Sequence, residues 1–83
     1  MDRYETDKQM EEAINFLKQN YRDCTFGGED ENYVMYDINL LESFVHVNIN
    51  KNDLTVNVKV YDVDSILIKE FSLKSVYEII DQI

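Results

Sequence analysis

His46 and Asp37 are the residues whose types and expected spacing come closest to forming an acid–base pair. Both occupy polar positions of neighbouring predicted strands, and the expected register sets the carboxylate beside the imidazole. A carboxylate in that place can orient an imidazole as a general base. A cross-strand ion pair on an open sheet is the far more common use of such a pair. We therefore expect a structural role for these two residues.

No other motif predicts catalysis or a metal site. Cys24 is the single cysteine, so no internal disulfide is expected, and no oxyanion-hole or nucleophile-turn motif accompanies it. Asp62 and Asp64 could hold Ca²⁺ or Mg²⁺ only loosely, and the sequence has no EF-hand loop. The Gly27–Gly28 pair lacks the ending of a phosphate-binding loop. The protein is therefore expected to be no enzyme and to bind no metal or cofactor.

Charge is the strongest compositional feature. The chain has 17 Asp and Glu residues against 8 Lys and Arg residues, which gives a formal net charge of −9. This excess opposes direct binding to nucleic acid or to an anionic membrane, because phosphate neutralisation needs clustered cations. It favours a basic protein partner, although many small proteins are acidic for solubility alone. Eight of the nine acidic residues within residues 1–31 fall in two groups: Asp2, Glu5, Asp7, Glu11 and Glu12, and then Glu29, Asp30 and Glu31.

The chain is expected to form a single domain, residues 1–83. Its apolar fraction of 45% is typical of a globular protein and argues against disorder. The acidic N-terminal segment has no apolar core of the kind found in secretion signals. No window approaches the roughly 18 apolar residues that cross a bilayer. With a lone cysteine that fits a reducing compartment, these features predict a cytoplasmic location, in a bacterial host cell if the gene belongs to a phage.

Residues 43–61 predict a β-hairpin. β-Branched residues alternate with polar ones on both sides of a turn at residues 50–53, as in strands with one buried face. The pairs expected on the buried face are Ile49 with Leu54, Val47 with Val56, and Val45 with Val58. A strand over residues 33–40 is expected to precede this hairpin, with Val34, Tyr36, Ile38 and Leu40 on its buried face. Its buried pairs are predicted to be Ile38 with Val45, Tyr36 with Val47, and Val34 with Ile49.

The remaining segments predict two helices, a loop and one further strand. Residues 6–22 carry an apolar stripe at helical spacing, made of Met10, Ala13, Ile14, Leu17 and Tyr21. Residues 23–32 are expected to be a loop, in which Gly27 and Gly28 break the helix. Residues 66–71 predict a fourth strand, for which two facings stay open. Pairing Val60 with Leu67 would bury Leu67 and Phe71, whereas pairing it with Ile66 would bury Ile66 and Ile68. Ser72 is expected to cap a closing helix with the apolar stripe Leu73, Val76, Ile79, Ile80 and Ile83.

These elements predict an α+β fold with the order α-β-β-β-β-α. Short connections favour a four-stranded antiparallel meander, since parallel strands need long crossovers. Each helix has one apolar stripe and the sheet has one apolar face. We therefore expect two layers, with the N- and C-terminal helices packed on one face of the sheet.

The acidic surface is the feature that predicts a function. Rigidly held carboxylates can stand in for a phosphate backbone and occupy a basic nucleic-acid groove. Small phage proteins that block nucleic-acid enzymes, anti-CRISPR inhibitors among them, often have this size and charge, but no motif in the chain matches any such family. The residues expected to contact the partner are Glu5, Glu11, Glu12, Phe26, Glu29, Asp30, Glu31 and Tyr33.

The first hypothesis is thus a non-enzymatic inhibitor or regulator of a basic, nucleic-acid-binding protein. The alternative is a structural or assembly module that forms a homodimer and has no target related to nucleic acid. Its contact would be an open edge strand or the polar face of the sheet, where Met35, Phe44 and Tyr61 lie among amides.

Overall fold

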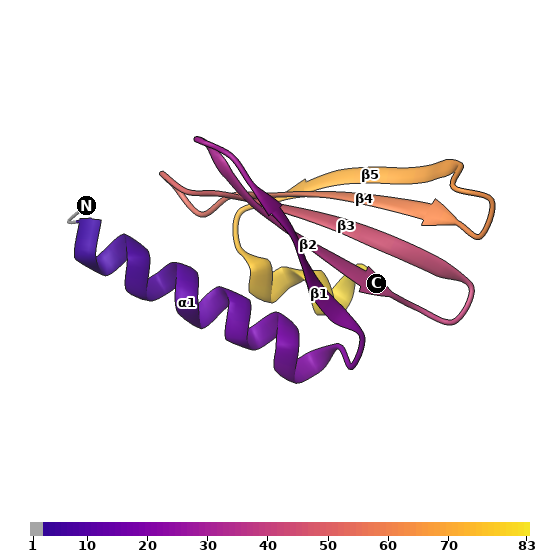
Figure 1. Ribbon diagram of the computed structural model, residues 1–83, viewed down its shortest axis with the longest axis horizontal. Helices are drawn as coiled ribbons and strands as arrows, with labels where there is room; N and C mark the ends of the chain where they lie inside the picture. Colours follow the sequence, from indigo (N-terminus) through magenta and orange to yellow (C-terminus); the bar gives the residue numbers. More distant parts are fainter. Residues whose placement is uncertain (1–2) are drawn as a thin grey trace.

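The computed structural model describes residues 3–83, with side chains from Thr6 onward. A long helix is followed by five strands and a short 3₁₀ helix: α1 (Arg3–Asn20), β1 (Cys24–Glu29), β2 (Tyr33–Asn39), β3 (Ser43–Asn50), β4 (Val56–Asp62), β5 (Leu67–Leu73) and η1 (Val76–Asp81). The strands form one antiparallel sheet in chain order, β1-β2-β3-β4-β5. Figure 1 shows α1 and η1 on the same face of this sheet. The predicted α+β class and the antiparallel meander are therefore confirmed.

The prediction of four strands was wrong, because part of the expected loop at 23–32 is the edge strand β1. Gly27 and Gly28 do not end the helix, which stops at Asn20, but lie at a β-bulge, where the register shifts between Phe26 and Gly28. Gly28 has a φ of 144°, a conformation open to glycine and strained for other residues. The two glycines thus form the bulge of an edge strand and do not belong to a loop.

The core lies between α1, η1 and the inner face of the sheet. Ala13 and Leu17 of α1 are buried, and the other members of the predicted stripe, Met10, Ile14 and Tyr21, pack partly buried around them. The helical stripe is thereby confirmed, although α1 spans Arg3–Asn20 and not 6–22. The sheet contributes nine buried residues from its three central strands: Val34, Tyr36, Ile38, Val45, Val47, Ile49, Val56, Val58 and Val60.

The register between β2 and β3 is the predicted one, with Val34 opposite Ile49, Tyr36 opposite Val47 and Ile38 opposite Val45. Leu40, which was expected on the same buried face, lies beyond β2 and is exposed.

The predicted register between β3 and β4 was wrong by two residues. The pairs are Ile49 with Val56, Val47 with Val58, and Val45 with Val60. The turn is longer than expected, because the Asn50 side chain accepts hydrogen bonds from the Asn52 and Asp53 backbone N–H groups, and Leu54 adopts a φ of 63°. A shift of two residues preserves the alternation, so the same side chains remain buried.

The expected C-terminal helix was also wrong in position and type. The chain stays in β5 through Leu73, and Ser75 instead of Ser72 caps the following element, which is the 3₁₀ helix η1. The Ser75 hydroxyl accepts from the Tyr77 N–H, while the Glu78 carboxylate accepts from the Ser75 N–H. Val76 and Ile79 are buried, whereas Ile80 of the predicted stripe is exposed.

Neither of the two pairings considered for Val60 occurs, although Phe71 faces the core as the first of them predicted. Val60 pairs with Lys69, and Phe71 lies opposite Val58, half-buried against the core. A register shift between Val60 and Tyr61 and a turn at residues 62–66 account for the difference. Ile66, Leu67 and Ile68 are consequently exposed.

Two Leu→Ala substitutions test this burial directly. Leu17 is 0% exposed and Leu41 is 98% exposed. Leu17→Ala should lower the free energy of unfolding by about 2–5 kcal/mol, because it leaves a cavity in the core. Leu41→Ala, the matched control, should change it by less than about 0.5 kcal/mol. Urea unfolding followed by circular dichroism measures both, and equal losses would contradict the described packing.

Candidate functional site

Asp37 and His46 meet as the sequence predicted. The His46 Nδ1 and the Asp37 Oδ1 are 2.6 Å apart, and both side chains are partly exposed. On β4, the strand on the other side of β3, Lys59 pairs with His46. Lys59 in turn pairs with Glu70 of β5. These four residues form one charged row across the face of the sheet that α1 and η1 leave open (Figure 1). Such a row, in which two basic side chains lie between two carboxylates, is typical of cross-strand stabilisation.

Gly27 provides the space that the Asp37 carboxylate occupies. A Cβ at this position would lie 2.6 Å from the Asp37 Oδ2 and 3.2 Å from its Cγ. Because His46 holds this carboxylate, a side chain at Gly27 would have to displace the ion pair. The sequence alone gave Gly27 only the role of a helix breaker; its partner across the sheet becomes evident only once β1 pairs with β2.

A double-mutant cycle tests this role of Gly27. Gly27→Ala should lower the free energy of unfolding by about 1–3 kcal/mol, as overpacking does. When Asp37 is already replaced by alanine, Gly27→Ala should lower the free energy of unfolding by at least about 0.5 kcal/mol less, because the carboxylate that clashes with the new Cβ is absent. Urea unfolding of the wild type, both single variants and the double variant provides the cycle. An identical cost in both backgrounds would show that Asp37 is not what excludes a side chain there.

The three consecutive acids Glu29, Asp30 and Glu31 have three different environments. Glu29 is paired with Lys51 of the β3–β4 turn, with 2.5 Å between the Lys51 Nζ and the Glu29 Oε2. Asp30 closes the β1–β2 turn, where its Oδ1 accepts from the backbone N–H groups of Asn32 and Tyr33. These two hydrogen bonds hold the pKa of the Asp30 carboxyl below its usual value. Glu31 is exposed at the tip of the turn.

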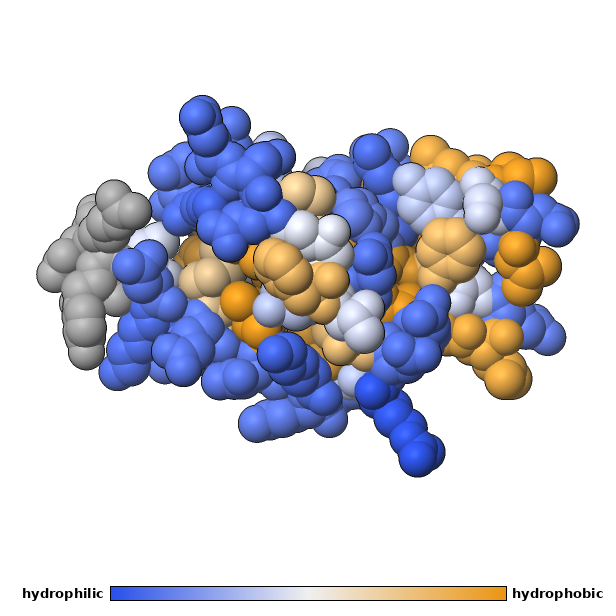
Figure 2. All heavy atoms as spheres, in the orientation of Figure 1, coloured by the Kyte–Doolittle hydropathy of each residue, from blue (hydrophilic) through white to orange (hydrophobic). Residues whose placement is uncertain are grey.

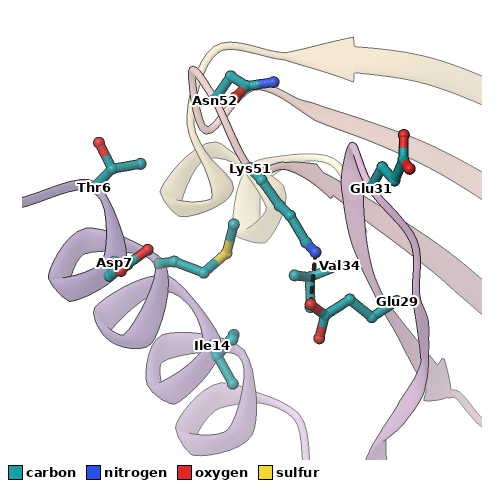
Figure 3. Close-up of a pocket in the computed structure, with 9 residues that line it drawn as sticks. Thr6, Asp7, Ile14, Glu29, Glu31, Val34, Lys51 and Asn52 are labelled. Atoms are coloured by element: carbon teal, nitrogen blue, oxygen red, sulfur yellow. Dashed lines mark hydrogen bonds and ion pairs between the residues drawn. The ribbon is translucent and has the colours of Figure 1, made fainter. Parts of the chain in front are cut away.

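A hollow of about 700 Å³ lies between the first half of α1, the β1–β2 turn and the β3–β4 turn. Met10, Ile14 and Val34 supply its apolar lining. Figure 3 shows Lys51 reaching from the β3–β4 turn to Glu29, with Asp7 and Ile14 on α1 across from them. We call this feature the acidic hollow; its charged members are Asp7, Glu29, Glu31 and Lys51.

The acidic hollow unites only part of the predicted partner-binding set. Glu29 and Glu31 line it, and Glu11 lies one helical turn after Asp7 on the same flank of α1. Glu12 lies on the other flank, where it lines a separate hollow beside η1. The side chain of Glu5 lies outside the described residues. Asp7, counted among the acids but not predicted as a contact, is a member that a helical projection would have identified.

The two predicted aromatic contacts lie on opposite faces of the sheet. Phe26 packs edge-on against Tyr36 on the face that α1 covers, with ring centroids 5.6 Å apart. Tyr33 is on the open face, beside Asn48 and Asn57. They therefore do not flank the acids as a pair.

Cys24 is half-buried against the core at the start of β1. Burial raises the pKa of its thiol, and the charge of Lys18 only partly opposes this effect. Within the described part of the chain, no three His, Cys, Asp or Glu side chains converge as metal ligands would. Neither helix there combines the length and apolar character that crossing a bilayer requires.

Comparison with protein-family models, with curated proteins and with solved structures gave no match to this chain. The functional argument therefore depends on the geometry and charge described above.

The pH dependence of stability tests the role of Asp30. Because folding lowers the pKa of this carboxyl, its contribution is present above the unfolded value of about 3.9 and is lost as the pH falls through the folded pKa. Asp30→Ala should therefore be less stable than the wild type at pH 7, and the difference should shrink as the pH falls below about 4. Urea unfolding between pH 7 and pH 3 measures this difference.

Glu31→Ala is the matched control, since it removes a neighbouring charge of the turn but neither of the two hydrogen bonds to the Asp30 carboxylate. The difference in the free energy of unfolding between Glu31→Ala and the wild type should vary little between pH 7 and pH 3. If the loss of stability in Asp30→Ala stays constant with pH, folding does not lower the pKa of the Asp30 carboxyl, and the role given to this residue is contradicted.

Proposed function

We propose that this protein is a non-enzymatic acidic binding module that inhibits or regulates a basic, nucleic-acid-binding protein. The observation that carries the proposal is the acidic hollow, in which three carboxylates face one ammonium group that is already paired with Glu29. The hollow therefore has a surplus of negative charge within a chain of net charge −9. A cationic group of a partner would neutralise this surplus of negative charge.

The lining of the hollow suits a long basic side chain. The aliphatic stem of an arginine or lysine can lie on Met10, Ile14 and Val34, while its charged head meets carboxylates at the rim. Arginine fits best, because its planar guanidinium binds carboxylates through two parallel hydrogen bonds. Arginine is also the residue with which nucleic-acid-binding proteins contact phosphate.

The Glu29 carboxylate and the backbone that carries Asp7 and Glu31 are held in place before a partner binds. Lys51 fixes Glu29, the Asp30 carboxylate fixes the turn that carries Glu31, and α1 carries Asp7. Side chains that are already ordered lose less conformational entropy on binding. A set of fixed negative charges can thus occupy a surface that normally receives the phosphates of a nucleic acid. Bound there, the protein would block access of DNA or RNA, as an inhibitor of the anti-CRISPR type does.

The homodimeric assembly module is the second proposal, and it has less support. Two of the residues on which it depends, Phe44 and Tyr61, already stack on each other with ring centroids 5.4 Å apart. Both are half-buried in that stack, which leaves less apolar surface for a second copy.

Affinity capture with two charge-matched variants tests the main proposal. The hollow variant carries Asp7→Lys and Glu31→Lys, whereas the control carries Asp23→Lys and Asp81→Lys, which are exposed and lie outside the hollow. At ~150 mM salt the wild type and the control should capture the same nucleic-acid-binding protein, and duplex DNA or RNA should compete for it. The hollow variant should capture it at least about tenfold less, as quantitative mass spectrometry would show.

Equal losses for the two variants would show that net charge alone drives capture. A partner that nucleic acid does not displace would contradict the proposed mode of inhibition.

A further inference from the structure

The end of the sheet opposite the acidic hollow carries an exposed apolar surface. In this meander, the β2–β3 and β4–β5 turns lie together at one end, away from the β1–β2 and β3–β4 turns that border the hollow (Figure 1). Figure 2 shows hydrophobic residues gathered at that end. Its six exposed apolar residues, which we call the apolar end, are Leu40, Leu41, Val63, Ile66, Leu67 and Ile68.

The two turns form one continuous surface because they are neighbours in the sheet. Ser43, which closes the β2–β3 turn by accepting from the Leu40 N–H, pairs directly with Asp62 of β4. Asp62 in turn organises the β4–β5 turn, where its Oδ1 accepts from the N–H groups of Asp64 and Ile66. Neither α1 nor η1 covers this end (Figure 1).

These apolar side chains are not needed by the core. Leu41 is 98% exposed, Val63 is 72% exposed and Ile66 is 60% exposed, although turns ordinarily carry polar residues and glycine. Single exposed apolar residues need no explanation, but six of them at one end of the sheet (Figure 2) favour a surface that another molecule covers.

Charge identifies the kind of molecule. Residues 40–43 and 62–68 contain three acids, Glu42, Asp62 and Asp64, and no Lys or Arg. The next cation along β5, Lys69, has its Nζ over the Phe71 ring, 5.0 Å from the centroid. A second copy would bring like charges together, and an anionic bilayer would be repelled.

We propose that the apolar end is a second protein-docking surface, which takes an amphipathic helix whose apolar side chains are flanked by Lys or Arg. This goes beyond the proposed function, because the surface lies at the other end of a molecule whose longest dimension is 41 Å. A protein held at the acidic hollow leaves this end accessible. The chain is therefore built to contact two partners, or two separate sites of one.

An NMR titration with designed peptides tests this inference. The probe is a synthetic amphipathic helix of leucine and lysine, and its control has glutamate in place of every lysine. The lysine peptide should shift the amide signals of residues 40–42 and 62–68, and the glutamate peptide should not. Leu41→Ser with Ile66→Ser should weaken binding at these residues at least about tenfold, since two aliphatic anchors are lost.

Charge and fold controls accompany this titration. Glu42→Gln with Asp64→Asn should weaken the same binding and reduce its dependence on salt, while all other amide signals confirm an unchanged fold. Asp7→Lys with Glu31→Lys should leave binding at the apolar end intact, so failure of this inference is distinguishable from failure of the proposed function.

Three results would overturn the inference. The first is shifts that are confined to the acidic hollow, and the second is equal binding of the two peptides. The third is concentration-dependent shifts at residues 40–42 and 62–68 without any peptide, which would identify a second copy as the occupant.

Discussion

The burial of one face of the sheet against α1 and η1 is the constraint on which the rest of the structure depends. Because side chains alternate along a strand, burying Val45, Val47 and Ile49 commits His46 and Asn48 to the open face. The charged row on that face is thus a consequence of core packing. The antiparallel order then sends alternate turns to opposite ends, so that the acidic hollow lies at one end and the exposed aliphatic residues lie at the other.

The sequence predicts best where periodicity and burial coincide. The stripe of α1 and the facing of β2 follow from apolar spacing, because a slip of one residue would expose Leu17 or Ile38. The register of β2 on β3 depends in addition on the short turn after Leu40. β1 has no such signal: most of its residues are exposed, and pairing to β2 with a bulge at Gly28 defines it. The β3–β4 turn was misjudged because a positive φ at a leucine, Leu54, has no recognisable sequence signal.

The sequence identifies the acidic residues of the candidate site, but it does not show which of them lie together in the hollow. Adjacent acids look equivalent in a sequence, yet one of the three at the β1–β2 turn is paired with Lys51 and another is bound to backbone amides. Only the tertiary fold brings Asp7 to the same hollow as Glu31 and separates Glu12 from both. Helical projection recovers the placement of Asp7, whereas the contact with Lys51 depends on a turn 22 residues away.

Hydrogen–deuterium exchange on the protein bound to its captured partner tests the central claim most directly. Our account predicts that backbone amides of the β1–β2 turn, of residues 51–52 and of the first turns of α1 become protected on binding. The open face of the sheet should exchange as it does in the free protein. Protection confined to that face, around His46 and Lys59, with no change at the acidic hollow, would contradict the account.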